Sequence, residues 1–280
     1  MTRPAAVTFA APDLDALAGT DGVVACAIPA DGTLDSGARR LDRLTKGAVK
    51  RAIGSPAWDR LKQGDILDLG FPTGMEASAV ALLRLDRKPD RDDAMAGGAA
   101  LAKLRGSRSL TILLHGQQRL VTELALAAAL RGYDFADHKT SAAKDKDADP
   151  DPGADPAPIT VLTPKADAAE AAFAPARAQA EGVFLTRDLV NEPANVLTTT
   201  EFATRLESLR DLGVEVEVLD EDKLEELGMR TLLGVGQGSE SPSKVVVMTW
   251  SGGGDEKPLA LIGKGVVFDT GGISLKPAAG

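Results

Sequence analysis

Residues 21–29, DGVVACAIP, form an uninterrupted apolar run with turn-forming residues at both ends. Such a run is typical of a strand buried on both faces, as in the parallel sheets of α/β proteins. A second run of this kind, SLTILLH, occupies residues 109–115, and residues 77–85 are also strand-like. The three stretches predict the central strands of one sheet.

Helical patterns separate these predicted strands. Residues 36–53 carry Leu41 and Leu44 at helical spacing, and residues 92–104 and 118–130 are rich in helix-forming residues. Strands that alternate with helices are typical of an α/β layered domain. We therefore expect such a domain over residues 1–163.

The second half of the chain predicts a linking helix and a second α/β domain. After a short strand at residues 159–162, an alanine-rich stretch predicts a linking helix over residues 164–192. The following elements, expected within residues 193–280, are a capped helix from Thr198, a strand at 214–220, a short helix after it, and strands at 244–250 and 259–268. Together they predict the beginning of a second α/β domain with a mixed sheet.

An acidic insertion lies at residues 141–158, SAAKDKDADPDPGADPAP. It holds five Asp, four Pro and five Ala and no large apolar side chain. Such a composition buries too little surface to offset the entropy lost on ordering, so we expect a disordered surface insertion.

Composition excludes several classes of protein. The chain has 280 residues, which favours two domains, and a formal net charge of −9, which disfavours broad binding to nucleic acid or anionic lipid. A single cysteine, Cys26, cannot form an internal disulfide, and this suits a reducing compartment. No apolar run reaches transmembrane length, and the first residues, MTRPAAVTFAAPDLDAL, contain no apolar h-region of the kind that a signal peptide has. We expect a cytoplasmic protein without membrane or nucleic-acid partners.

Two motif-like features carry little chemistry. GVGQGS at residues 234–239 lacks the third glycine of a dinucleotide-binding loop, and a turn is the simpler interpretation. The two histidines, His115 and His138, are 23 positions apart and far from the cysteine, so no Cys/His metal cluster is predicted.

The stretch at residues 263–277, GKGVVFDTGGISLKP, is unlike a packing strand. Lys264 interrupts an apolar run where a sheet interior prefers aliphatic residues, and Asp269 falls where the predicted strand ends. Ligands of open α/β sheets bind at that edge, and Lys276 follows after a Gly-Gly turn that could fold back over it. The spacing alone leaves two interpretations open: a ligand site, or an exposed lysine beside an ordinary turn.

Several segments, taken in order, resemble the leucyl aminopeptidase (cytosol aminopeptidase) family. They are NEPAN at residues 191–195, GQGS at 236–239, and the GKGVVFDTGGISLKP stretch. The resemblance covers about residues 183–280. The first 140 residues are similar in layout, and LRGYDFADHKT at 130–140 resembles the segment before the family's linker.

The resemblance implies a two-metal aminopeptidase, hexameric in its complete form, that releases N-terminal residues, often leucine, from peptides. Manganese or zinc would be the cofactor. Lys264 and Asp269 would be metal ligands, with Asp269 bridging two ions about 3.5–4 Å apart, and Lys276 would be catalytic and polarise the scissile carbonyl. A lysine amine binds a metal only when neutral, which costs free energy at pH 7.

The family takes its remaining carboxylate ligands from sequence further along than residue 280. We therefore expect this chain to be the N-terminal portion of such an enzyme, ending inside the catalytic domain and inactive alone. Two alternatives stay open, a non-catalytic binding or oligomerisation module and a nucleotide- or sugar-binding α/β protein. A nucleotide- or sugar-binding protein fits the N-terminal layout, but the sequence lacks the glycine-rich loop that would hold a phosphate.

A first prediction concerns the acidic insertion. Limited digestion with a protease of broad specificity is expected to cut first within residues 141–158, because their composition offers no packed structure to protect the backbone. Mass spectrometry of the earliest fragments identifies the cut. First cuts elsewhere, with this stretch intact, would contradict the prediction.

Overall fold

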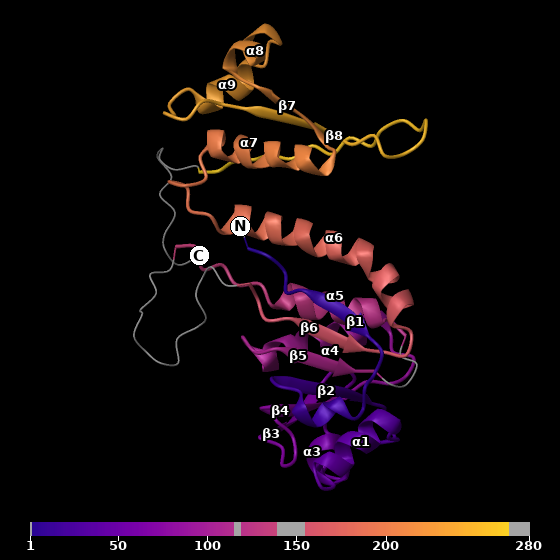
Figure 1. Cartoon of the computed structure of the whole chain (residues 1–280). Coiled ribbons are helices and arrows are strands. Elements are labelled where there is room, and N and C mark those ends of the chain that lie inside the picture. Colours follow the sequence, from indigo (N-terminus) through magenta and orange to yellow (C-terminus); the bar gives the residue numbers. More distant parts are fainter. Residues whose placement is uncertain (1, 115–118, 139–154, 269–280) are drawn as a thin grey trace. The chain divides into compact units, whose positions relative to one another are not determined.

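A computed structural model of the chain describes residues 2–114, 119–138 and 155–268 (Figure 1). The chain divides into two compact units, Met1–Asp188 (unit 1) and Leu189–Gly280 (unit 2). Residues 141–154 of the predicted acidic insertion lie outside the described residues, whereas residues 155–158 are in neither helix nor strand. The predicted domain limits stay predictions.

Unit 1 contains a six-stranded, mostly parallel sheet. The strands are β1 (Val7–Ala10), β2 (Val23–Ile28), β3 (Ile66–Gly70), β4 (Ala79–Arg84), β5 (Leu110–Leu113) and β6 (Ile159–Leu162). They lie in the order β1-β6-β5-β2-β4-β3, and β3 alone runs antiparallel to its neighbour. The predicted α/β fold class is confirmed.

Helices cover both faces of this sheet. They are α1 (Ser36–Leu44), α2 (Ala48–Ile53), α3 (Pro56–Asp59), α4 (Arg91–Arg105), α5 (Val121–Arg131) and α6 (Ala166–Asn191), with a 3₁₀ turn at Ala16–Gly19. Strand alternation divides the core into two layers. Val23 of β2 packs in one cluster with residues of α4, α5 and α6, whereas Val24 and Cys26 pack in the other with residues of α1 and α3.

The lone cysteine is buried at the centre of this second layer. Cys26 is 1% exposed. Burial, with a smaller contribution from the charge of Asp35, raises the pKa of the thiol far above its usual range. Cys26 is a free cysteine, and it serves here as a small apolar core residue.

Sequence patterns missed some local features of unit 1. The helix predicted over residues 36–53 is two helices, because Lys46 and Gly47 adopt positive φ values of 52° and 81° between them. Strands β1 and β3 were not predicted. Each is four or five residues long and lies at an edge of the sheet, where apolar patterning is weak.

Helices α4 and α5 pack closely together at Gly98. A Cβ atom added there would lie 2.0 Å from the carbonyl oxygen of Leu124 and 3.0 Å from Cβ of Ala127. These distances are far below van der Waals contact, so a side chain at residue 98 would force the two helices apart. The absence of a side chain at Gly98 thus sets the separation of α4 and α5.

A buried carboxylate fastens α6 to the N-terminus of the chain. Asp188 is 1% exposed and accepts hydrogen bonds from the backbone N–H and hydroxyl of Thr2, at 2.6 and 2.5 Å, and from the Tyr133 hydroxyl at 3.0 Å. The Tyr133 ring packs edge-on against Phe184, and Arg187 lies over its face. The C-terminal part of α6 therefore packs as an integral part of unit 1.

Unit 2 contains a two-stranded antiparallel ribbon with short helices. Its elements are α7 (Thr199–Glu207), a 3₁₀ turn (Ser208–Leu212), β7 (Glu215–Leu219), α8 (Glu221–Glu226), α9 (Arg230–Gly236) and β8 (Val245–Thr249). Thr198 and Asp220 cap α7 and α8 through their side-chain oxygens, as the sequence predicts for α7. Helix α9 was not predicted.

The strand predicted at residues 259–268 is wrong. This segment is neither helix nor strand, and Leu259, Leu261 and Ile262 are 85–99% exposed. A strand needs a neighbouring strand for its backbone groups and an apolar layer for its side chains. Among the described residues, β7 and β8 pair with each other and neither pairs with this segment.

None of the helices in the described part of the chain combines the length and apolarity needed to cross a lipid bilayer.

A second prediction tests the helix contact. Gly98→Ala is expected to lower the free energy of unfolding by about 1–3 kcal/mol, because the added methyl group collides with backbone. Gly182→Ala is the matched control, since residue 182 is also within a helix but has open space around its Cβ position. The control is expected to stabilise the protein by about 0.5–1 kcal/mol. Urea unfolding followed by circular dichroism measures both, and equal effects would contradict the proposed role of Gly98.

Candidate functional site

The predicted metal and catalytic residues fall at the end of unit 2. Lys264 is exposed and lies in the irregular segment that follows β8. Asp269 and Lys276 lie outside the described residues. The predicted convergence of Lys264 and Asp269 therefore stays a prediction.

The segment that carries Lys264 passes close to α7. A Cβ atom added to Gly265 would lie 3.1 Å from a ring carbon of Phe202 in that helix. The glycine beside the lysine therefore lets the backbone approach an aromatic side chain closely, as glycines near ligand sites often do.

The NEPAN motif makes a structural junction at the start of unit 2. Glu192, whose side chain is 4% exposed, forms an ion pair with Arg205 of α7 at 3.0 Å. The Pro193 carbonyl accepts hydrogen bonds from the N–H groups of Val196 and Leu197, which turns the chain toward α7. The motif thus forms the turn that leads into α7.

Arg205 joins two carboxylates within this junction. Its guanidinium also contacts Glu201, one helical turn earlier, at 2.9 Å. The hydrogen bond to the Glu201 side chain is the main cause that raises the pKa of Arg205, with Glu192 adding to it and burial opposing it. Because the Glu192 side chain is almost fully buried, its charge needs compensation, and Arg205 provides part of it.

The GVGQGS segment is only partly the turn that the sequence favours, because residues 234–236 belong to helix α9 and the turn is confined to residues 237–238. Helix α9 ends at Gly236, and the Ser239 N–H donates to the Gly236 carbonyl at 2.9 Å. A Cβ at Gly236 would overlap the Ser243 hydroxyl, so this glycine serves close packing. A phosphate-binding loop would instead precede the N-terminus of a helix.

The described residues do not by themselves form a metal site. Within residues 2–114, 119–138 and 155–268, no three His, Cys, Asp or Glu side chains are grouped as metal ligands. The exposed amine of Lys264 is a single nitrogen donor, and a divalent metal site needs several donors. The described part of the chain therefore supplies one possible ligand of such a site, the amine of Lys264.

Comparison with known proteins identifies the origin of these motifs. Residues 184–280 match the model of the cytosol aminopeptidase family, catalytic domain. The chain is 58% identical over 280 residues to a protein of Dinoroseobacter shibae named "Probable cytosol aminopeptidase", and 48% identical over 281 residues to one of Cereibacter sphaeroides with the same name.

Over its whole length the chain is similar to proteins named as probable cytosol aminopeptidases, and residues 184–280 match the family's catalytic domain. The resemblance inferred from the motifs is thereby confirmed. Both alignments cover all of the chain and 55% of the relative, so the chain spans about half the length of these relatives.

Solved structures show the same fold. A mutant of tomato leucine aminopeptidase superposes with a TM-score of 0.65 at 16% identity, over 88% of this chain and 52% of that one. The bottromycin maturation enzyme BotP, solved in complex with Mn, gives a TM-score of 0.58 at 23% identity, over 82% of this chain and 45% of that one.

A third prediction tests the junction made by the NEPAN motif. Glu192→Gln keeps the side-chain shape but leaves Arg205 without one of its two carboxylates, so we expect unit 2 to lose about 1–3 kcal/mol of stability. The amides of α7 should exchange hydrogen faster as a result. Glu226→Gln is the control, because it breaks the exposed Lys223–Glu226 pair and should cost less than about 1 kcal/mol. Equal exchange in both variants would contradict a structural role for Glu192.

Proposed function

We propose that this chain supplies the N-terminal portion of a metal-dependent aminopeptidase that releases N-terminal amino acids, leucine preferred, from peptides. The observation that carries the proposal is the family match of residues 184–280, which contain the whole GKGVVFDTGGISLKP stretch. The names of the two bacterial relatives support peptide substrates.

Three residues are assigned roles in this proposal. Lys264 and Asp269 would bind the metal ions, and Lys276 would stabilise negative charge that develops on the scissile carbonyl oxygen. The exposure of Lys264 supports its role, because its amine is accessible to an ion and to further ligands. Lys276 acts best as a cation, so its role differs from that of Lys264.

The cofactor would be two divalent ions, manganese or zinc. Such ions polarise carbonyl groups and acidify water at neutral pH, which is the chemistry that peptide hydrolysis needs. The name of the BotP complex records Mn with a protein of the same fold, and this supports the choice of a divalent ion. Asp269 supplies the carboxylate that such ions favour.

The remaining parts of the proposal concern assembly and location. The complete protein would be a homo-hexamer in the cytoplasm, in accord with the family resemblance and with the word cytosol in the relatives' names. Because Lys264 and Asp269 are too few donors for two ions, we expect the 280-residue chain alone to be inactive.

A fourth prediction separates the roles of the three residues. The test protein joins this chain to the remaining C-terminal half of the Dinoroseobacter shibae relative. Asp269→Ala is expected to lose metal and activity together, because it removes a carboxylate shared by the ions. Lys276→Ala should keep its metal and lower kcat by about 10²–10³-fold, a typical cost of removing one oxyanion-stabilising group.

Elemental analysis and hydrolysis of a leucine anilide measure these effects. Lys257→Ala, a change of an exposed lysine in the same irregular segment, is the control and should alter neither quantity. Loss of metal in the Lys276 variant would contradict its assignment. Turnover by the 280-residue chain, above that of a chelator-treated sample, would contradict its inactivity.

A further inference from the structure

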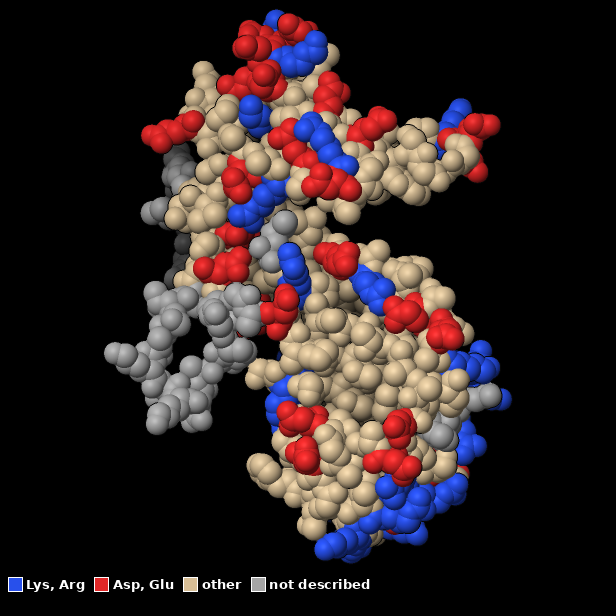
Figure 2. Space-filling model, in the orientation of Figure 1, with Lys and Arg blue, Asp and Glu red and all other residues tan. Residues whose placement is uncertain are grey.

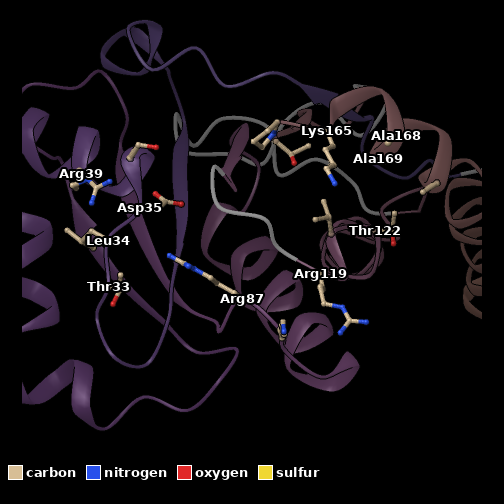
Figure 3. A pocket seen from close by; sticks show the side chains of 16 residues that line it. Thr33, Leu34, Asp35, Arg39, Arg87, Arg119, Thr122, Lys165, Ala168 and Ala169 are labelled. Carbon is tan, nitrogen blue, oxygen red and sulfur yellow. The ribbon is translucent and has the colours of Figure 1, made fainter.

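Unit 1 contains a pocket that the aminopeptidase proposal does not use. Its volume is about 1010 Å³. It opens where β2, β4, β5 and β6 end, and its walls come from the segments that follow these strands and from α6 (Figure 3). Sequence analysis missed this site, because the residues that line it come in small groups from four segments that are far apart in the sequence.

The topology of the sheet explains why a hollow forms there. Strands β2 and β5 are neighbours, but the chain leaves them in opposite directions. After β2 it continues into α1 on one face of the sheet, whereas after β5 it continues into α5 on the other face, as their separate core clusters show. A crevice outside the carboxyl ends of two such strands is the usual ligand site of open α/β sheets.

The lining of the pocket is strongly cationic. Arg39, Arg87, Lys88, Arg119 and Lys165 line it, together with one carboxylate, that of Asp35. All five cations are exposed, and within the described residues none of them forms a salt bridge. In Figure 2, Lys and Arg side chains gather along the right-hand and lower margin of unit 1.

The cations approach one opening from different elements. Arg87 follows β4 and extends toward Asp35 at the start of α1, whereas Lys165 and Arg119 lie on the other side of the opening (Figure 3). Asp35 already accepts a hydrogen bond from the Ala38 N–H as the cap of α1. In the described residues no side chain caps α5, so its first N–H groups, beside Arg119, also favour an anion.

One wall of the pocket is apolar. It is formed by small and aliphatic residues at the beginnings of α5 and α6, namely Val121, Pro164, Ala168 and Ala172, whereas Leu34 lies on the opposite side of the opening, beside Arg39 (Figure 3). A ligand that is charged over its whole surface would gain no binding free energy from contact with this apolar wall. The pocket is also large enough for a molecule of nucleotide size, since ligand pockets of about 300–1,000 Å³ hold drug-sized molecules.

We propose that this pocket binds a nucleoside phosphate, with the phosphoryl groups among the cations and the nucleoside against the apolar wall. Phosphoryl groups suit it better than a single carboxylate, because several cations line one opening and arginine pairs with phosphate in a bidentate manner. The arginines and lysines take the place of the glycine-rich backbone loop that dinucleotide-binding folds use, and that this sequence lacks.

Isothermal titration calorimetry of the 280-residue chain tests the proposal with four probes: ADP, pyrophosphate, adenosine and citrate. ADP is expected to bind saturably and most tightly, pyrophosphate more weakly, and adenosine and citrate weakest of all. Arg87→Gln and Lys165→Gln should each weaken ADP binding by about tenfold or more, the usual effect of losing one charge-assisted contact.

Two matched variants control for the change in net charge. Arg60→Gln and Lys103→Gln remove exposed cations of unit 1 that do not line the pocket, and they should change ADP affinity less than about twofold. Thermal denaturation confirms that all four variants are folded.

Each other result overturns the proposal. Absence of saturable ADP binding at millimolar concentration excludes a nucleotide site. Equal binding of citrate and ADP excludes phosphate recognition, and equal binding of pyrophosphate and ADP excludes recognition of the nucleoside. Equal losses in the pocket and control variants place any binding outside the pocket. None of these outcomes depends on aminopeptidase activity.

Discussion

The central strands of unit 1 are buried on both faces, and this constraint determines the rest of the unit. Because β2 is apolar throughout, and β4 and β5 each carry a single polar residue (Arg84 and Thr111), helices must cover both sides of the sheet, and the chain must cross from one side to the other. The glycine at residue 98 lets α4 and α5 form one tight layer. The loops at the carboxyl edge are left to carry polar side chains, and the cationic pocket lies there.

Unit 2 has far fewer buried apolar residues than unit 1, and ion pairs hold part of its local structure. The ribbon of β7 and β8 has few buried side chains, and the ion pairs of Arg205 join the NEPAN motif to α7. A motif that marks the family in sequence therefore has a structural role in this part of the chain. The chemistry proposed for the family is assigned to the later GKGVVFDTGGISLKP stretch.

The sequence predicted most of unit 1 because its central strands are apolar runs bounded by turn residues. Such a run indicates a buried strand even when the neighbouring elements are unknown. It missed β1 and β3, which are short and lie at the sheet edges. It failed at residues 259–268, because an apolar run shows that burial is favourable but not whether a partner strand is available. Of the site residues, Lys264 could be recognised by its place in a motif. The cations of the pocket could not, since only the fold brings Arg39, Arg87 and Lys165 to one opening.

The burial of Cys26 has a practical consequence. Thiol reagents attack the thiolate, and burial both shields this sulfur and keeps it protonated. Because β2 is at the centre of the sheet, the sulfur becomes accessible only when the whole layered structure opens. The rate at which a thiol-reactive dye labels Cys26 in the native protein therefore reports how often unit 1 opens. This measurement needs no engineered cysteine.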